Sequence, residues 1–216
     1  GNPIEDYFDE NLSRFAEYQN YIHELELMMR FVRQKYNLNF GVMLQPQRTH
    51  FTQDYQGQHN EITRKVTNFS PTLDFRYRFN QLSNLRINYR GTTTQPEMSD
   101  LLDITDDSDP LNIRKGNPAL KPAFTNNFRL FYNTYIQDHQ RALMTFINYS
   151  TTRNSISDRV SYDETTGGRT IQPENINGNW NVNGAFMFNT AIDSLGYWNV
   201  NTFTRAQYNN YVAFLN

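Results

Sequence analysis

Four aspartates in a short stretch form the densest group of possible metal ligands in the chain: Asp103, Asp106, Asp107 and Asp109. Ca²⁺ prefers several oxygen ligands on a flexible loop, but this spacing misses the EF-hand pattern. Loop aspartates also accept hydrogen bonds from nearby backbone N–H groups and so stabilise turns. We therefore expect these acids to cap turns, and the sequence predicts no metal ligand.

Other residue types that could do chemistry also lack a catalytic spacing. The histidines are scattered, without the His-x-x-x-His or Glu-x-x-His pairs of zinc and di-iron sites; they are His23, His50, His59 and His139. No serine lies in a nucleophile elbow, Gly167-Gly168 lacks the lysine of a phosphate-binding loop, and the chain has no cysteine. The sequence predicts neither an enzyme nor a cofactor site.

Glu24 and Glu26 could share one strand face and imitate the carboxylate pair of an acid–base catalyst. Polar side chains on one strand face are also expected where a barrel encloses a water-filled lumen, and this explanation is simpler. The net charge of −2 and the scattered Lys and Arg leave no footprint for nucleic acid. The chain holds no run of about 20 apolar residues, which excludes membrane-spanning helices and leaves barrels open.

Alternation of apolar and polar residues is the strongest signal in the chain. Between residues 69 and 80, odd positions are mostly aromatic or aliphatic and even positions are polar, which predicts a strand with one apolar face. Further strands are predicted by the same alternation at residues 20–31, 36–45, 84–90, 127–137, 177–189 and 198–205. Residues 142–151 are also predicted as a strand, but they are apolar on both faces in places, so the pattern does not give its orientation. The polar positions of 177–189 are mostly asparagine, a poor strand former. A water-filled lumen explains this row, and a soluble sheet with one solvated face is the alternative.

Residues 20–31 also fit a helix, because Ile22, Leu25 and Met29 recur at helical spacing. We predict a strand, since a helix would leave the neighbouring strands without a partner. Aromatic residues near strand ends suit the interface girdles of a barrel, with a soluble aromatic core as the alternative. The candidates for a girdle are Tyr132, Tyr135, Tyr149, Trp180, Tyr197 and Trp198.

The predicted links alternate in length, as in a barrel with tight turns at one end and large loops at the other. Short links are predicted near Gln34 and at 80–84, 138–140 and 191–196; long ones are predicted at 53–62, 92–123 and 152–175. Within the last, the sheet is expected to continue, with Pro173 at a bulge or an edge because it cannot donate to the ladder. The patterns predict an all-β fold, an antiparallel meander of about eight long strands that forms part of a transmembrane β-barrel.

The link at 92–123 begins with a predicted short capped helix at 94–102. The prolines and glycine of 106–122 argue against both helix and regular strand. Within it, Gly116-Asn117-Pro118-Ala119-Leu120-Lys121-Pro122 resembles the Gly-Asn-Pro-x-Leu-Lys-Pro stretch of TonB-dependent outer-membrane receptors. Asn88-Tyr89-Arg90, Gln95-Pro96, Leu101 and Asp109-Pro110 precede it in the order found in the receptor-like outer membrane protein β-barrel family. The resemblance covers most of residues 20–205 and is specific over 69–137.

The resemblance implies a barrel of about 22 strands around an N-terminal plug, in the outer membrane of a Gram-negative cell. It implies ligand binding and uptake, with outer-membrane lipid, an unidentified ligand and the TonB complex as partners. The motif would lie in an outer loop, with Gly116, Asn117, Pro118, Leu120, Lys121 and Pro122 as its residues. Because a plug, a TonB box and a terminal strand signature are missing, we expect residues 1–216 to be one internal barrel segment. The alternative function is a soluble extracellular β-sandwich that binds a ligand.

Overall fold

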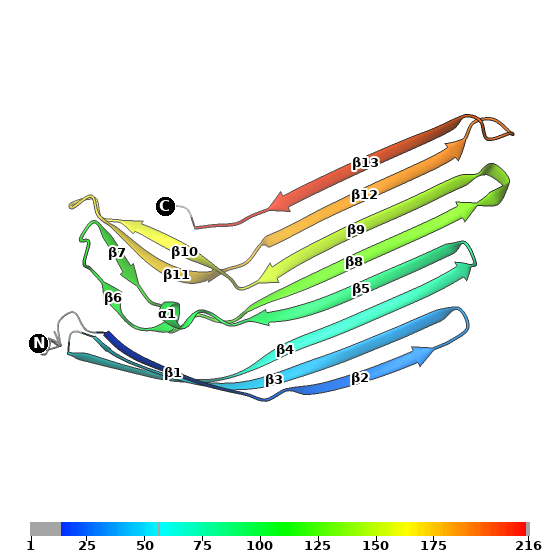
Figure 1. Ribbon diagram of the computed structural model, residues 1–216. Helices are drawn as coiled ribbons and strands as arrows, with labels where there is room; N and C mark the ends of the chain where they lie inside the picture. The colour runs from blue at the N-terminus through cyan, green and yellow to red at the C-terminus, as the bar shows by residue number, and fades with distance from the viewer. Residues whose placement is uncertain (1–13, 56, 215–216) are drawn as a thin grey trace, which may run out of the picture.

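The structure, a computed structural model, describes residues 14–55 and 57–214. A nine-stranded sheet dominates it, and the strands follow one another in chain order (Figure 1). The sheet contains β1 (Arg14–Ile22), β2 (Leu25–Val32), β3 (Tyr36–Tyr55), β4 (Gln58–Asn80), β5 (Ser83–Thr94), β8 (Ala123–Ile136), β9 (Arg141–Arg153), β12 (Asn179–Ala191) and β13 (Asn199–Asn210). β2 pairs with the first part of β3 and β1 with the last part, so these two share one position. The predicted all-β meander of eight long strands is therefore confirmed.

Every ladder in this sheet is antiparallel, and the register keeps the alternation of each strand in phase with its neighbours. Phe75, for example, lies opposite Leu38 on β3 and Ile87 on β5. The strand predicted at 20–31 is confirmed as β1 and β2, and the helical alternative is wrong. Among the described residues, no helix has the length and apolar character needed to cross a membrane.

A second, four-stranded sheet lies at one end of the large sheet (Figure 1). Its strands, in spatial order, are β10 (Ser155–Tyr162), β11 (Arg169–Ile176), β7 (Asn112–Lys115) and β6 (Thr105–Asp106). Together with helix α1 (Met98–Leu101) we name this part the cap. The buried apolar residues gather in and beneath it, and they are Leu101, Leu102, Leu120, Ala123 and Ile171.

The two ends of the large sheet differ, and we name them the turn end and the loop end. Short connections at 33–35, 81–82, 137–140 and 192–198 lie at the turn end, as predicted. The third of these contains η1 (Gln137–His139). In the fourth, the backbone N–H groups of Trp198 and Tyr197 donate to Asp193 and hold the pKa of its carboxyl below the usual value. The cap lies at the loop end.

Two predictions about the loop end are wrong. Residues 53–62 are not a long loop, because β3 runs to Tyr55 and β4 begins at Gln58, so the connection is a tight hairpin. Residues 106–122 do contain regular strand, because Asn112–Lys115 form β7, parallel to β11. The predicted place of Pro173 is confirmed, since β7 pairs only with residues 169–171 of β11 and leaves the edge at Pro173 without a strand partner.

Candidate functional site

One face of the large sheet carries no charged side chain over its middle rows, and we name it the uncharged face. It consists of alternate residues in 25–31, 36–44, 69–79, 83–91, 128–134, 143–149, 180–188 and 200–208. Large apolar side chains on it are open to the surroundings, such as Leu27 at 63% exposed and Phe128 at 42%. A continuous exposed apolar surface marks contact with a membrane or with another protein.

Two rows of aromatic rings cross the uncharged face. The row nearer the loop end joins Tyr89, Phe128, Tyr149, Trp180 and Tyr208, with ring centroids 4.8, 6.0, 6.4 and 5.1 Å apart. The row nearer the turn end joins Tyr36, Phe75, Tyr77, Phe79 and Tyr132, at 6.2, 6.3, 4.8 and 6.0 Å. On β8 the two rows lie only four residues apart, at Phe128 and Tyr132, or about 13 Å along the strand. The girdles of a barrel flank an apolar band about 25 Å tall, so these rows form one aromatic surface and not the two girdles.

The six predicted girdle residues divide between three places. Tyr149, Trp180 and Tyr132 lie in the aromatic rows. Tyr135 does not, because it pairs with Ala142 on the opposite face of the sheet, and this part of the prediction is wrong. Tyr197 and Trp198 lie in the connection between β12 and β13 at the turn end.

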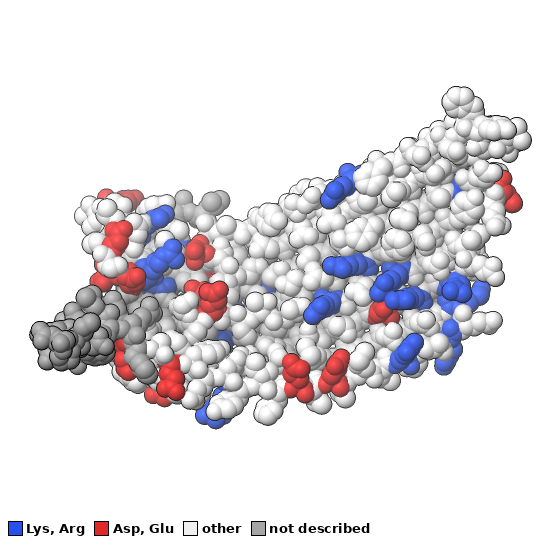
Figure 2. Space-filling view, in the orientation of Figure 1, with Lys and Arg blue, Asp and Glu red and all other residues white. Residues whose placement is uncertain are grey.

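The opposite face, which we name the polar face, is rich in arginine. Figure 2 shows basic side chains gathered over this face of the sheet, mostly on the half nearer the turn end. In the middle rows its arginines are Arg30, Arg76, Arg78, Arg86, Arg90, Arg129 and Arg205, and its acids are Glu24, Glu26 and Asp74. Asp74 contacts both Arg86 at 3.3 Å and Arg76 at 3.8 Å. One acid therefore faces several cations, and the face can attract anionic groups.

Asparagine and glutamine fill much of the remaining polar face. Asn68 donates to Gln45 at 3.1 Å and to Gln47 at 3.3 Å, and it accepts from Gln95 at 2.6 Å. Gln45 in turn donates to Glu24 at 3.0 Å. The predicted pair of Glu24 and Glu26 thus lies on this face, as the lumen explanation requires. The asparagine row of β12 lies on it too and is partly open to solvent.

Inside the cap, hydrogen bonds join the family motif in the connection between β5 and β8 to residues 172–175 in the connection between β9 and β12. The Asn117 side chain donates to the carbonyl of Pro173 at 2.9 Å, and Gln172 donates to the carbonyl of Gly116 at 3.1 Å. The Asn175 side chain accepts from the backbone N–H of Lys121 at 2.8 Å and donates to its carbonyl at 2.9 Å. Leu120 is 4% exposed. The motif residues therefore connect segments that lie more than 50 residues apart in sequence.

Gly116 meets a requirement that only glycine satisfies. A Cβ at this position would lie 1.6 Å from the carbonyl oxygen of Leu102. The close approach lets the N–H of Gly116 donate to Ile104 at 3.1 Å and that of Asn117 donate to Asp100 at 2.6 Å. Among the predicted motif residues, the glycine and the asparagine thus have visible structural roles.

The loop aspartates form local turns in the structure. Asp109 accepts from the Asn112 side chain at 2.9 Å and from the N–H of Leu111 at 3.1 Å, which lowers the pKa of its carboxyl. Asp106 accepts from the N–H of Ser108 at 3.1 Å. Over 14–55 and 57–214, no three acids or histidines lie close enough together to hold a metal ion.

The structure brings two histidines to one carboxylate, which sequence reasoning missed. Glu61 contacts His50 at 3.2 Å and His59 at 3.9 Å near the tip of the β3–β4 hairpin. His59 also forms a close contact with Asp54, and this hydrogen bond raises the pKa of the imidazole. The contact would have followed from the sequence only if the hairpin pairing of Tyr55 with Gln58 had been recognised, because that pairing sets the register.

Comparisons with known proteins identify the family. Residues 4–214 match the model of the outer membrane protein beta-barrel family. No curated protein matches the chain. Among solved structures, the siderophore receptor PirA of Pseudomonas aeruginosa aligns with TM-score 0.45 and 14% identity over 92% of this chain and 44% of that one. The siderophore receptor PirA of Acinetobacter baumannii aligns with TM-score 0.42 and 12% identity over 82% of this chain and 35% of that one.

The chain thus spans less than half the length of either receptor. The family match, in contrast, includes nearly every residue of the sheet and the cap. On that match, the chain belongs to the outer membrane protein β-barrel family and is located in the outer membrane of a Gram-negative cell.

Proposed function

We propose that residues 1–216 form one internal wall segment of a receptor-like barrel that binds a ligand and takes it up across the outer membrane. The uncharged face meets lipid and the polar face lines the lumen. The observation that carries this proposal is the confinement of the charges in the middle rows to one face. In a soluble two-layer sheet the uncharged face would be covered, but the four-stranded cap lies at the end of the sheet and leaves it open.

In this orientation the loop end faces the cell exterior, because outer-membrane barrels have short periplasmic turns and longer external loops. The cap then stands at the mouth of the lumen, where a ligand arrives. Arginines on the wall below it favour a ligand that carries negative charge. Energy would come from the TonB complex through a plug domain, and the proposal assigns no catalysis, cofactor or metal to the chain.

Uptake is tested with the full-length parent protein in living cells. Mass spectrometry compares the compounds left in the medium by cells that produce the protein, cells that lack it, and producing cells treated with a protonophore. We expect at least one anionic compound to be depleted only by untreated producing cells. Depletion that persists with the protonophore would contradict TonB-driven uptake, and absence of any selective depletion would contradict uptake itself.

A matched pair of variants tests the role of the polar face. Arg90 lies on the polar face, whereas Arg153 pairs with Phe124 on the other face near the loop end. Arg90→Gln should slow the depletion by several-fold, about the effect of one charge-assisted contact, and Arg153→Gln should leave the rate unchanged. An equal effect of both substitutions would argue against a lumen-facing Arg90.

A further inference from the structure

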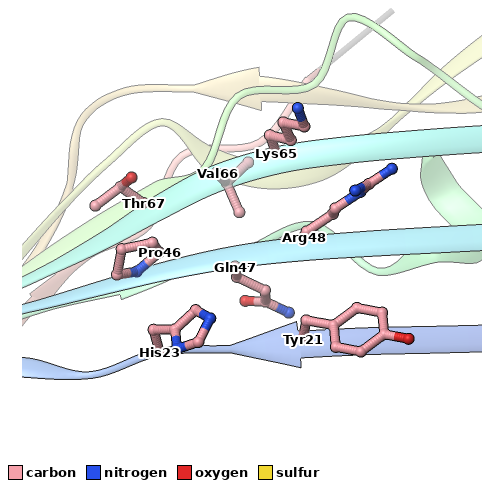
Figure 3. A pocket seen from close by; sticks show the side chains of 8 residues that line it. All are labelled: Tyr21, His23, Pro46, Gln47, Arg48, Lys65, Val66 and Thr67. Carbon is pink, nitrogen blue, oxygen red and sulfur yellow. The ribbon is translucent and has the colours of Figure 1, made fainter.

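Two cations lie just beyond the uncharged face, toward the loop end. Leu44 pairs with Phe69 in the last apolar row of β3 and β4. Four residues further along β3, Arg48 pairs with Tyr21 on β1 and Lys65 on β4, and all three side chains are exposed on this same face. They line an open groove of about 560 Å³ together with His23 and Thr67, and Figure 3 shows these lining residues.

Neither cation has an acidic partner in the part of the chain that the structure describes. Within the described ranges, no carboxylate oxygen lies within 4.0 Å of Arg48 or Lys65. The nearest acids on this face of β1 and β4 are Glu17 and Glu61, two rows further out, and Glu61 contacts His50. Like charges directly opposite each other on adjacent strands destabilise a sheet. A bound anion between Arg48 and Lys65 would remove that repulsion.

The position of Arg48 and Lys65 relative to the membrane indicates that the anion belongs to a lipid head group. Four residues of strand span about 13 Å, and a strand tilted by about 45° then places Arg48 some 9 Å beyond the last apolar row. Polar head groups occupy about the first 5–8 Å outside the hydrocarbon core, so the long side chains of Arg48 and Lys65 can reach back to them from just outside. The row of Leu44 and Phe69, with Phe69 42% exposed, offers a surface for acyl chains directly below the cations.

We propose that Arg48, Lys65 and Tyr21 bind a phosphate group of a lipid in the outer leaflet. The guanidinium of Arg48 can donate two parallel hydrogen bonds to a phosphate, Lys65 supplies a point charge, and the Tyr21 hydroxyl supplies a further donor. The cation on the opposite face at this height, Arg64, already donates to Gln95 at 3.3 Å. The inference rests on the proposed lipid-facing orientation and not on ligand uptake.

Native mass spectrometry of the full-length parent protein in mild detergent tests the proposal. The probes are lipid A with both phosphates, the same lipid with its phosphates removed, and inorganic phosphate. We expect the protein to bind phosphorylated lipid A about tenfold more tightly than the dephosphorylated form, and Arg48→Gln with Lys65→Gln to abolish that difference. Arg33→Gln with Lys35→Gln removes the same charge at the turn end and should leave the preference intact.

Each other outcome overturns the proposal. Equal binding of the two lipids, or an unchanged preference in the Arg48 and Lys65 variant, would show that these cations do not recognise phosphate on a lipid. Displacement of the lipid by inorganic phosphate at millimolar concentration would make the groove a site for free phosphate. If the double variant does not assemble, Lys65→Gln alone, at an exposed position, replaces it, and this variant should reduce the preference for phosphorylated over dephosphorylated lipid A. Because no transported ligand is present, these results are independent of the uptake experiment.

Discussion

At the scale of single residues, the family motif holds two distant segments of the cap together by hydrogen bonds. Asn117 connects to the carbonyl of Pro173, and Gly116 lies against the backbone at Leu102 so closely that no side chain fits. These contacts join parts of the chain that share no local pattern, and the sequence alone could not predict them. The resemblance singled out this motif, and the structure shows a packing role for Gly116 and Asn117.

Gly116→Ala should open the cap without unfolding the large sheet. The new methyl group must displace the carbonyl of Leu102, which breaks the hydrogen bonds from Gly116 to Ile104 and from Asn117 to Asp100. Loss of one or two buried hydrogen bonds costs about 1–3 kcal/mol, so amide hydrogen exchange of residues 98–117 should accelerate roughly tenfold or more.

Gly167→Ala is the matched control for that change. Nothing lies within 4 Å of a Cβ at Gly167, whose φ is 72°, so this substitution adds only local backbone strain of about 1 kcal/mol at the β10–β11 tip. Exchange at residues 98–117 should stay as in the parent protein. The same acceleration in both variants would show that the approach of Gly116 to Leu102 does not hold the cap.

At the scale of elements, the sequence predicted strands wherever one face is apolar and failed where both faces are polar. Residues 69–80 alternate because one face is apolar and the other carries Asp74, Arg76 and Arg78. Beyond Leu44 and Phe69, both faces of the β3–β4 hairpin carry polar side chains, so the period of two disappears and residues 53–62 resemble a loop. Because residues 53–62 were predicted to be a loop, the sequence could not predict that His50 and His59 contact Glu61.

The cap strand β7 was missed for a different reason. Its four residues, Asn112–Lys115, lie between Pro110 and Gly116, which favour turns, and the strand is too short to show alternation. It is set by its pairing with β11, whose residues follow more than 50 positions later. Short strands of this kind depend on tertiary contacts, whereas the long strands carry their own signal.

Two single substitutions at adjacent positions on β4 test which face of the sheet contacts lipid. Phe75→Arg places a charge on the uncharged face and should destabilise the barrel by about 2–4 kcal/mol if that position lies near the bilayer midplane. Assembly of the full-length protein into the outer membrane, measured by its heat-modifiable mobility in gels, should fall sharply. Arg76→Phe, on the polar face beside Asp74, is the control and should assemble nearly as the parent does. Similar assembly of the two variants would contradict a lipid-facing Phe75.

At the scale of the whole molecule, the separation of the two faces extends over all eight strand positions. One aromatic row covers β3, β4 and β8, the other covers β5, β8, β9, β12 and β13, and both lie on the uncharged face. The arginines of the polar face reach from β2 to β13. Cross-strand pairs share a face, so one register error would have mixed the two surfaces. The consistency across ladders is therefore stronger support for a membrane wall than any single strand.

Spin labels on β12 should report opposite surroundings at adjacent positions. The chain has no cysteine, so Asn181→Cys and Val182→Cys can each carry one label in the full-length protein reconstituted in bilayers. Val182 pairs with Tyr149 and Tyr208 on the uncharged face, whereas Asn181 pairs with Ser150 on the polar face. Oxygen concentrates in lipid and a charged nickel chelate stays in water, so relaxation of the Val182 label should respond mainly to oxygen and that of the Asn181 label mainly to nickel. At each position the response to oxygen is divided by the response to nickel. The difference in this ratio between the two positions should persist even if a plug limits access to the lumen. Equal ratios at both positions would mean that β12 does not separate lipid from water, and the proposed wall would have to be abandoned.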